Sequence, residues 1–334
     1  MDTQEFLGFA EKYKNWGRWG KDDEIGTLNF VSPQAIVDAC HLVRKGAVFS
    51  LAIPFDSNGP QRPGIGRRFN PIHSMLRTGM DHPGMLSGDP PIVFFADDMV
   101  TMPLQSATQW DSLAHAFFKG KMYNDRPASL VDGQGARKNS IDKVKKRMVG
   151  RGVLVDIPRH RGVPWLDLGQ SVPPDELDAC LRRQKVEVKE GDFLLVRTGV
   201  MAHSRSQKDW RIYNEKGYPG LNVSCAPWLY EKRVAAVCSD CSGVEEVKGA
   251  VGLPQRAAPA DGSKGPHPEP EAELRYPLHC VCLVNMGMMF GEIFDLDELA
   301  EDCAQDGVYE FLFVAAPLPF TKAVGSPVNP YAIK

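Results

Sequence analysis

The chain has 334 residues, 43% of them hydrophobic and 24% charged, and 39 basic against 42 acidic side chains give a formal net charge of −3. This composition is typical of a globular protein with a large core, and the near-neutral charge excludes a strongly basic nucleic-acid-binding surface. No run of about 18 apolar residues occurs, which excludes a transmembrane helix. We therefore expect neither a nucleic-acid partner nor a membrane partner.

The first part of the chain predicts a helix, a strand and a long loop. Ser32 is a good N-cap, Pro33 fits the first helical turn, and Gly46 ends the apolar stripe that follows. Residues 48–55 have the pattern of a strand. Residues 56–91 are rich in Gly and Pro and show no hydrophobic period, which predicts a long loop that serves as a lid or a binding arm.

Apolar runs of strand length and amphipathic helical runs are mixed along the rest of the chain. Residues 92–96 (Ile-Val-Phe-Phe-Ala) are expected to form a buried strand, and the Ala/Pro/Gly/Glu-rich residues 257–273 predict a flexible insertion. The other expected strands are 150–157, 192–197, 234–238 and 308–316, and the other expected helices begin at Pro174, at Ala226 and after the N-cap Asp295. Because the elements do not follow a regular βαβα order, we predict one mixed α/β domain over residues 1–334.

The eight cysteines indicate a reduced, cytoplasmic protein. They are few for a chain of this length and lie mostly in apolar runs, which favours buried thiols over a disulfide framework. Cys238 and Cys241 form a CxxC pair, but no second pair follows at the spacing of a zinc ribbon. We expect buried thiols there, with a redox pair as the alternative. Residues 1–5 are polar and acidic, unlike a secretory signal.

The densest polar cluster consists of Gln105, Gln109, Asp111 and His115. All four occupy odd positions, so they would share one face of an extended strand. A straight strand would place Gln105 and Asp111 about 20 Å apart, so the segment must bend if both groups bind one ion. Asp111 and His115 offer an oxygen and an imidazole, which are common metal ligands. The alternative is that His115 packs in the core and Asp111 caps a turn.

His279 and Glu292 form a second candidate cluster, thirteen residues apart (292 − 279). Glu292 directly follows an apolar run and Gly291, which is an unusual place for a carboxylate. The alternative is that Glu292 begins a surface loop. Asp240 and Glu245 form a further polar pair, for which a structural role is expected; the alternative is that the pair lies near the site.

With these residues in place, the sequence resembles the cyclase family of metal-dependent hydrolases, whose members include kynurenine formamidases and isatin hydrolases. The family signature is His-x-Gly-Thr-His-x-Asp-x-Pro-x-His, with polar offsets of 0, 4, 6 and 10. Those offsets fall here on Gln105, Gln109, Asp111 and His115, and Thr108 also matches. Further matches are Trp19, Gly20, Asp23, Gly26 and Asn29 near the start, the Gly291–Glu292 step, and residues 325–330.

The resemblance implies a fold and an oligomer. The fold would be the swivelling β/β/α type, a barrel-like mixed sheet flanked by helices. The family is usually oligomeric, which implies a homodimer or a higher homo-oligomer in which residues 56–91 exchange between subunits.

The resemblance also implies a set of metal ligands. A divalent ion, Zn²⁺ or Mn²⁺, would be bound by Asp111, His279 and Glu292, with Gln105 or Gln109 assisting. Both glutamines stand where the signature has histidine, and an amide is a neutral and weaker oxygen ligand. This version of the motif is similar to a subgroup that contains trans-dienelactone hydrolase, a metal-dependent lactone hydrolase, so we still expect an enzyme.

The predicted function is metal-dependent hydrolysis of a small carbonyl substrate, a lactone, amide or ester. His115 would act as the general acid/base on a metal-activated water, with Glu292 as the second catalytic residue. Arg67, Arg68 or Arg77 would hold a substrate carboxylate, unless they form a solvated surface. Two other functions stay open: a lyase, dehydratase or cyclase that acts without net hydrolysis, and a non-enzymatic binding protein on the same scaffold.

Overall fold

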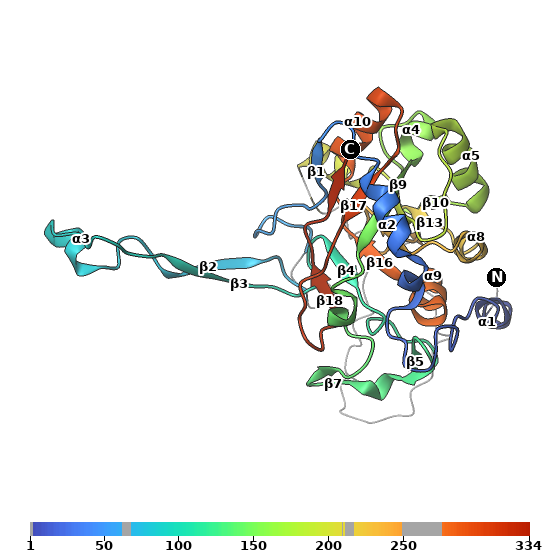
Figure 1. Cartoon of the computed structure of the whole chain (residues 1–334), viewed down its shortest axis with the longest axis horizontal. Coiled ribbons are helices and arrows are strands. Elements are labelled where there is room, and N and C mark those ends of the chain that lie inside the picture. Colours follow the sequence, from blue (N-terminus) through green and yellow to red (C-terminus); the bar gives the residue numbers. More distant parts are fainter. Residues whose placement is uncertain (1–2, 62–67, 209, 211–216, 249–275) are drawn as a thin grey trace, which may run out of the picture.

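A nine-stranded mixed sheet lies at the centre of the computed structural model, which describes residues 3–61, 68–208, 210, 217–248 and 276–334 (Figure 1). Four neighbouring strands, β9, β11, β14 and β16, run parallel, and antiparallel strands extend the sheet on both sides. In sheet order the strands are β1 (Val48–Ser50), β19 (Tyr331–Ile333), β17 (Glu310–Val314), β9 (Val149–Asp156), β11 (Phe193–Arg197), β14 (Ala236–Ser239), β16 (Met289–Glu292), β4 (Gln109–Asp111) and β18 (Gly325–Pro327). The predicted mixed α/β class is confirmed.

Helices pack on both faces of this sheet because its central strands are apolar on both faces. On β11, Leu194 and Val196 join a core formed with α1, α5, α8 and the π-helical segment η4. Phe193 and Leu195, which alternate with them, join a second core formed with α2 and α10. The helices of the described residues are α1 (Thr3–Glu11), α2 (Pro33–Cys40), α3 (Pro83–Ser87), α4 (Ile157–Arg161), α5 (Pro174–Gln184), α6 (Val200–Gln207), α8 (Cys225–Lys232), α9 (Pro277–His279), η4 (Cys280–Met286) and α10 (Asp297–Asp306). None of them combines the length and the apolar character that crossing a membrane needs.

Short elements fill the connections between these layers. The 3₁₀ turns are η1 (Gly26–Phe30), η2 (Ala128–Leu130) and η3 (Ile141–Val144). The two-stranded sheets of the body pair β5 (Lys121–Met122) with β6 (Arg126–Pro127), β7 (Val131–Asp132) with β8 (Gly135–Ala136), β10 (Ser171–Val172) with β13 (Gly220–Leu221), and β12 (Gly217–Tyr218) with β15 (Val247–Lys248).

The first predicted helix begins where expected and ends early. The hydroxyl of Ser32 accepts the Ala35 N–H at 3.0 Å, which confirms the predicted N-cap. The helix stops at Cys40, so the rest of the apolar stripe up to Gly46 lies in turns. The predicted strand over residues 48–55 is likewise shorter and ends at Ser50.

The last predicted helix has a different N-terminus from the one expected. It begins at Asp297, and its N-cap residue Leu296 provides no side-chain cap. Asp295 was expected to cap it but instead accepts a hydrogen bond from Arg205 Nη1 at 2.9 Å. The strand β17 falls inside the predicted residues 308–316, but it is not the last strand, because the short β18 and β19 follow it.

The predicted loop over residues 56–91 is wrong for its second half, and so is the predicted buried strand over residues 92–96. The structure instead shows a long two-stranded arm that projects from the body (Figure 1). Its strands β2 (Ile72–Arg77) and β3 (Asp97–Thr101) pair antiparallel, and α3 lies at its tip. Residues 92–96 are not a strand, and Ile92 is fully exposed at 103%. The predicted insertion over residues 257–273 lies outside the described residues.

Candidate metal centre

Two neighbouring strands place three of the predicted site residues on one face of the sheet. In the antiparallel pair of β4 and β16, Gln109 lies opposite Glu292, and Asp111 lies opposite Phe290. Residues two apart on a strand, and residues directly opposite across an antiparallel pair, point to the same side. Gln109, Asp111 and Glu292 therefore share a face, and Gln109 Nε2 donates a hydrogen bond to Glu292 Oε2 at 2.9 Å.

Packing on the opposite face fixes this orientation of both strands. Trp110 is fully buried there and donates its indole N–H to the Ala315 carbonyl at 2.8 Å. Gly291, opposite Trp110, has no room for a side chain, because a Cβ would lie 2.8 Å from Cys238 Sγ and 2.8 Å from the ring of Phe294. A shift of one residue would bury the polar face against this core, so the register is strongly specified.

His279 reaches the same face from the end of α9. The carboxylate of Glu245 accepts the backbone N–H groups of Leu278 at 2.8 Å and of His279 at 2.9 Å. It also contacts His279 Nδ1 at 2.5 Å. A carboxylate can only accept, so Nδ1 donates, and Nε2 is directed to Glu292 Oε1 at 3.4 Å.

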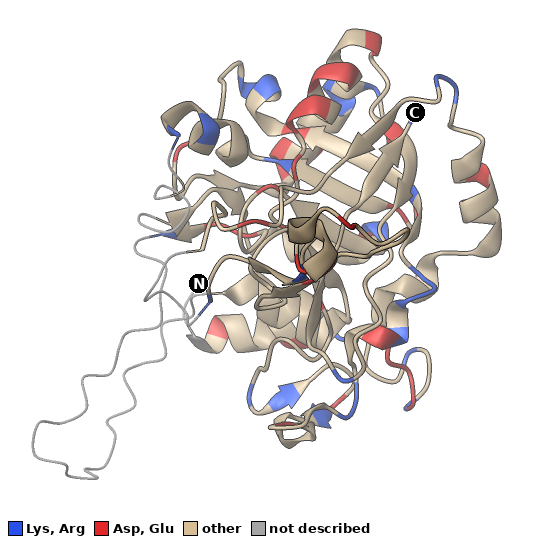
Figure 2. Ribbon diagram, turned by 90° about the vertical axis from the view of Figure 1, so that its left-hand side faces the viewer, with Lys and Arg blue, Asp and Glu red and all other residues tan. Residues whose placement is uncertain are grey.

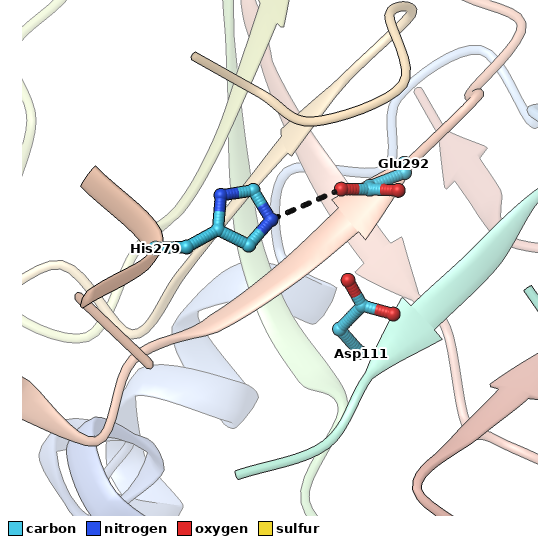
Figure 3. A group of neighbouring side chains, drawn as sticks. All are labelled: Asp111, His279 and Glu292. Atoms are coloured by element: carbon cyan, nitrogen blue, oxygen red, sulfur yellow. Dashed lines mark ion pairs between the residues drawn. The ribbon is translucent and has the colours of Figure 1, made fainter. Parts of the chain in front are cut away.

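These residues form the compact group that Figure 3 shows. Ligand atoms of Asp111, His279 and Glu292 all lie within 4.8 Å of one another, and all three residues are buried. The expected meeting of Asp111, His279 and Glu292 is therefore present. Residues 105–111 do not form one straight strand, because Gln105 lies in a turn and β4 covers only Gln109–Asp111.

The arrangement of polar atoms fits a cation. Among the described residues, Asp111 Oδ1 and Gln109 Oε1 are buried without a hydrogen-bond partner, which is costly unless another group binds them. Burial, and next the negative charge of Glu292, raise the pKa of Asp111 well above its usual range. For Glu292, burial acts in the same direction, but the hydrogen bond with His279 and the nearby positive charges together outweigh it and lower the pKa. Two buried carboxylates at this spacing favour a positive charge between them.

His279 supplies that positive charge when no ion does. Burial opposes its charged form, but hydrogen bonds with Glu245 and Glu292 raise the pKa of His279 to about 10. The residues present offer carboxylate oxygens, an amide oxygen and one imidazole nitrogen, a set of ligands that suits Zn²⁺ or Mn²⁺.

His115 follows β4 and lies at the edge of the group. Its Nε2 is 3.7 Å from Asp111 Oδ2, and 24% of its side chain is exposed. Burial, and next the positive charge of Arg68, lower the pKa of His115 to about 4. The ring is therefore neutral at pH 7.

The remaining predicted polar residues are placed differently. Arg68 donates from Nη1 to the Gln105 carbonyl at 3.1 Å, so it lies at the site, whereas Arg77 is on β2 with its guanidinium 5.6 Å from the ring of Phe94. Arg67 lies outside the described residues. Gln105 Nε2 is buried against Gly325 and has no hydrogen-bond partner among the residues that the structure describes.

Glu245 is the site residue to which sequence reasoning gave only a structural role. It was paired with Asp240 and given a structural role, but the two carboxylates bind different groups: Asp240 accepts the N–H groups of Thr198 and Gly199, and Glu245 accepts those of Leu278 and His279. No fixed spacing links Glu245 to His279, and no motif marks it. Only the folded chain brings the two together.

The comparisons with known proteins agree with this geometry. A family model described as "Putative cyclase" matches residues 30–246. A crystal structure of a novel cyclase is 37% identical, with a TM-score of 0.83 over 96% of this chain and 100% of that chain. Among proteins with curated functions, no match is found.

Two isatin hydrolases share the fold at lower identity. Isatin hydrolase A from Labrenzia aggregata, bound to benzyl benzoate, is 18% identical, with a TM-score of 0.57 over 90% of this chain and 98% of that chain. Isatin hydrolase A from Ralstonia solanacearum is 19% identical, with a TM-score of 0.58 over 86% and 91%. These likenesses confirm the predicted cyclase-like fold.

Proposed function

Because the chain belongs to the cyclase family, we propose that it is a metal-dependent hydrolase of a small carbonyl substrate, a lactone, amide or ester. The observation that carries this proposal is the buried group of Asp111, His279 and Glu292, with ligand atoms within 4.8 Å of one another. Buried carboxylates beside an imidazole are costly to fold unless a cation or a proton compensates them.

We propose that the ion is bound by Asp111, Glu292 and His279 Nε2, with the amide oxygen of Gln109 as a further ligand. The unpaired state of Gln109 Oε1 and Asp111 Oδ1 among the described residues supports this set. When bound, Zn²⁺ or Mn²⁺ polarises a carbonyl oxygen and lowers the pKa of a bound water. Gln105, which was also expected to assist, stays a prediction.

The side chain of His115 is the proton carrier in this proposal. Its Nε2 lies 3.7 Å from Asp111 Oδ2, at the edge of the proposed ion site, and in this position the ring takes a proton from water and returns one to the leaving group. Glu292 is the second catalytic residue of the proposal and acts as a ligand of the ion. The amide of Gln109 and the ring of His279 hold its carboxylate in place. Arg68, which is bound to the carbonyl of Gln105, is available to orient an anionic substrate.

Incubation of the metal-loaded protein with lactones, amides and esters in heavy-oxygen water tests the reaction type. Net hydrolysis must incorporate one labelled oxygen into the product, detected by mass spectrometry. If a substrate is converted and the product carries no label, the enzyme is a lyase, dehydratase or cyclase and not a hydrolase. Absence of conversion across all three substrate classes would count against the hydrolase.

Three finer expectations belong to the same proposal. We propose a homodimer or a higher homo-oligomer, as the family resemblance implies. The cytoplasmic location and the likeness to the trans-dienelactone hydrolase subgroup stay predictions.

A further inference from the structure

A cavity of about 530 Å³ lies between the loop that precedes the arm and the C-terminal half of α6. Sites for small molecules in proteins typically have volumes of roughly 300–1,000 Å³. The cavity shares no residue with the group of Asp111, His279 and Glu292. Its lining includes a lysine, an arginine, a tryptophan and three uncharged polar side chains: Lys208, Arg205, Trp210, Asn58, Gln61 and Ser204.

The first wall of the cavity is a loop that the side chain of Asn70 holds in place. Asn70 Oδ1 accepts the Gln61 N–H at 2.8 Å, and Nδ2 donates to the carbonyls of Gln61 at 3.0 Å and of Ser57 at 3.2 Å. Gly59 lies so close to this amide that a Cβ would be 2.8 Å from Asn70 Oδ1. The wall is therefore already formed before a ligand binds, as is usual for small-molecule sites.

The second wall is α6, which is fixed by ion pairs to the segment after β16. Arg205 Nη1 donates to Asp295 Oδ1 at 2.9 Å and to Asp297 Oδ2 at 3.0 Å. These two carboxylates balance the charge of Arg205 and orient its guanidinium. Arg205 therefore shapes the wall and leaves the binding of an anion to another cation.

Lys208 is that cation. It ends α6, with a φ of 51°. Its ammonium group forms no ion pair within the described residues. The side of the body from which the arm projects carries both acidic and basic segments, as Figure 2 shows. Attraction of an anion to the cavity therefore depends on Lys208 itself and not on a broad basic surface.

Trp210 gives the cavity a flat apolar surface. It is partly buried and packs against a core cluster that includes Ile293, so the body holds it. The amide side chains of Asn58 and Gln61 belong to the same lining. An indole, an ammonium group and amides together suit a flat organic anion, because its ring packs on the indole and its carboxylate accepts hydrogen bonds from the ammonium group.

Both walls are joined to the strands that carry the proposed metal ligands. Gln61 Nε2 donates to the Ser106 carbonyl at 3.0 Å, and Ser106 is three residues before Gln109. On the other side, Asp295 binds α6 and is three residues after Glu292. Three residues span at most about 11 Å, so the cavity adjoins the metal centre although it is built from other residues.

We propose that this cavity is a binding site for a small aromatic carboxylate, separate from the metal centre. Lys208 donates to the carboxylate of the ligand, and Trp210 packs on its ring. The ligand bridges the loop before the arm and α6, and through them the segments next to β4 and β16. Because the unfolded chain has no such site, binding also raises the unfolding temperature of the protein.

Titration of the purified protein with phenylacetate, followed by saturation-transfer NMR, is the first test. A dissociation constant on the order of 1 mM or lower is expected for a ligand of this size, together with a rise in Tm. Phenylacetamide lacks the charge and acetate lacks the ring, so each should bind roughly tenfold more weakly. Failure of phenylacetate to bind, or equal binding of phenylacetamide, would overturn the proposal.

Two lysine variants test the assigned cation. Lys208→Gln should weaken the binding of phenylacetate roughly tenfold, the loss typical of one charge-assisted hydrogen bond. Lys185→Gln is the matched control, because Lys185 is also an exposed lysine that ends a helix with a positive φ, of 55°. Equal affinities of the two variants would remove Lys208 from the site. Trp210→Leu should reduce the preference for phenylacetate over acetate, and an unchanged preference would remove the indole.

The double variant Asp111→Asn/Glu292→Gln separates this site from the metal centre. It removes two proposed metal ligands, and it should bind phenylacetate with the wild-type affinity. Arg68→Gln should likewise leave the affinity unchanged, since Arg68 is bound to the Gln105 carbonyl and not to the cavity. Loss of binding in either variant would place the carboxylate at the metal centre and overturn the proposal. None of these measurements depends on turnover, so the proposed function stands or falls separately.

Discussion

Glu245 holds the imidazole that the proposed metal centre needs. Its carboxylate accepts three N–H groups, two from the backbone and one from His279 Nδ1. Because Nδ1 is bound to Glu245, Nε2 is the ring nitrogen that faces Asp111 and Glu292. The contact with the carboxylate also makes the ring a more basic ligand. Acidic residues behind a ligating histidine act on the metal without touching it.

Glu245→Gln is therefore expected to lower the affinity for Zn²⁺ or Mn²⁺ by roughly 10–100-fold while the fold is kept, because an amide replaces the charged acceptor. Competition with a metal-binding dye measures the affinity. Glu246→Gln is the matched control, since the neighbouring carboxylate binds Asn222 instead. Equal affinities of the two variants would remove the positioning role of Glu245.

His115 is expected to affect turnover and not metal binding. His115→Ala should lower kcat by roughly 10²–10⁴-fold, since a positioned acid/base typically contributes that much. Metal content should stay at the wild-type level, because the three clustered ligand groups are intact. His41→Ala removes an exposed histidine as the control. Wild-type turnover in the His115 variant, measured on a substrate that the wild type hydrolyses, would discard the assignment.

The elements that hold the site could be predicted to different degrees. The central strands β9 and β11 were predicted closely, because apolar runs such as Phe193–Val196 are buried on both faces of a parallel sheet. The three-residue strand β4 could not be predicted, because Gln109 and Asp111 are polar and the segment has no apolar alternation. It becomes a strand through its pairing with β16 and β18, which are distant in the sequence. The pairing of Asp111 with Phe290 is a long-range contact that no local pattern encodes.

The arm shows the opposite failure. Residues 92–96 are apolar, and sequence reasoning placed them in the core of their own chain. The apolar pattern does not say whether the body of the chain covers these residues. Exposure of Ile92 and Phe95 in the single chain makes the distinction visible.

The register of β16 gives an element-scale prediction. Gly291→Ala should destabilise the protein by about 1–3 kcal/mol, because the new methyl group overlaps Cys238 and Phe294. Urea denaturation measures the change. Gly133→Ala is the control, because nothing lies within 4 Å of its Cβ position. Equal stabilities of the two variants would contradict the close packing behind the site.

The C-terminal end of α10 is tied to β19 and to the segment before β1 by charge. Lys334 Nζ contacts Asp306 at 2.9 Å, and Lys45 Nζ contacts it at 2.5 Å. Partial burial raises the pKa of Asp306, but the hydrogen bonds from Lys45 and Lys334 outweigh this effect and lower the pKa from 3.8 to about 2. A lowered carboxyl pKa stabilises the folded state above its ordinary pKa and ceases to do so as the pH falls through the lowered value.

Asp306→Asn should therefore lower stability at pH 7 by about 1 kcal/mol, because Asp306 and Lys45 still touch solvent although Lys334 is buried. The difference from wild type should shrink as the pH is lowered from about 4 toward 2. Thermal unfolding across that range measures it. A difference that stays constant with pH would show that the charge of Asp306 is not the cause.

At the scale of the whole molecule, the fold and the site were predicted by different means. Composition and apolar patterning indicated a mixed α/β protein, whereas the meeting of Asp111, His279 and Glu292 was expected from the resemblance of the chain to a family. The structure then adds what neither source contained: the carboxylate of Glu245, the unpaired oxygens beside Asp111, and an apolar arm that its own body does not cover.

Metal content tests the central claim most directly. Protein purified without chelators and measured by elemental analysis should contain about one Zn²⁺ or Mn²⁺ per chain, and Asp111→Asn/Glu292→Gln should contain almost none while remaining folded. A wild-type protein without a divalent ion, even after incubation with both metals and gel filtration, would contradict the account, as would equal metal content in the double variant.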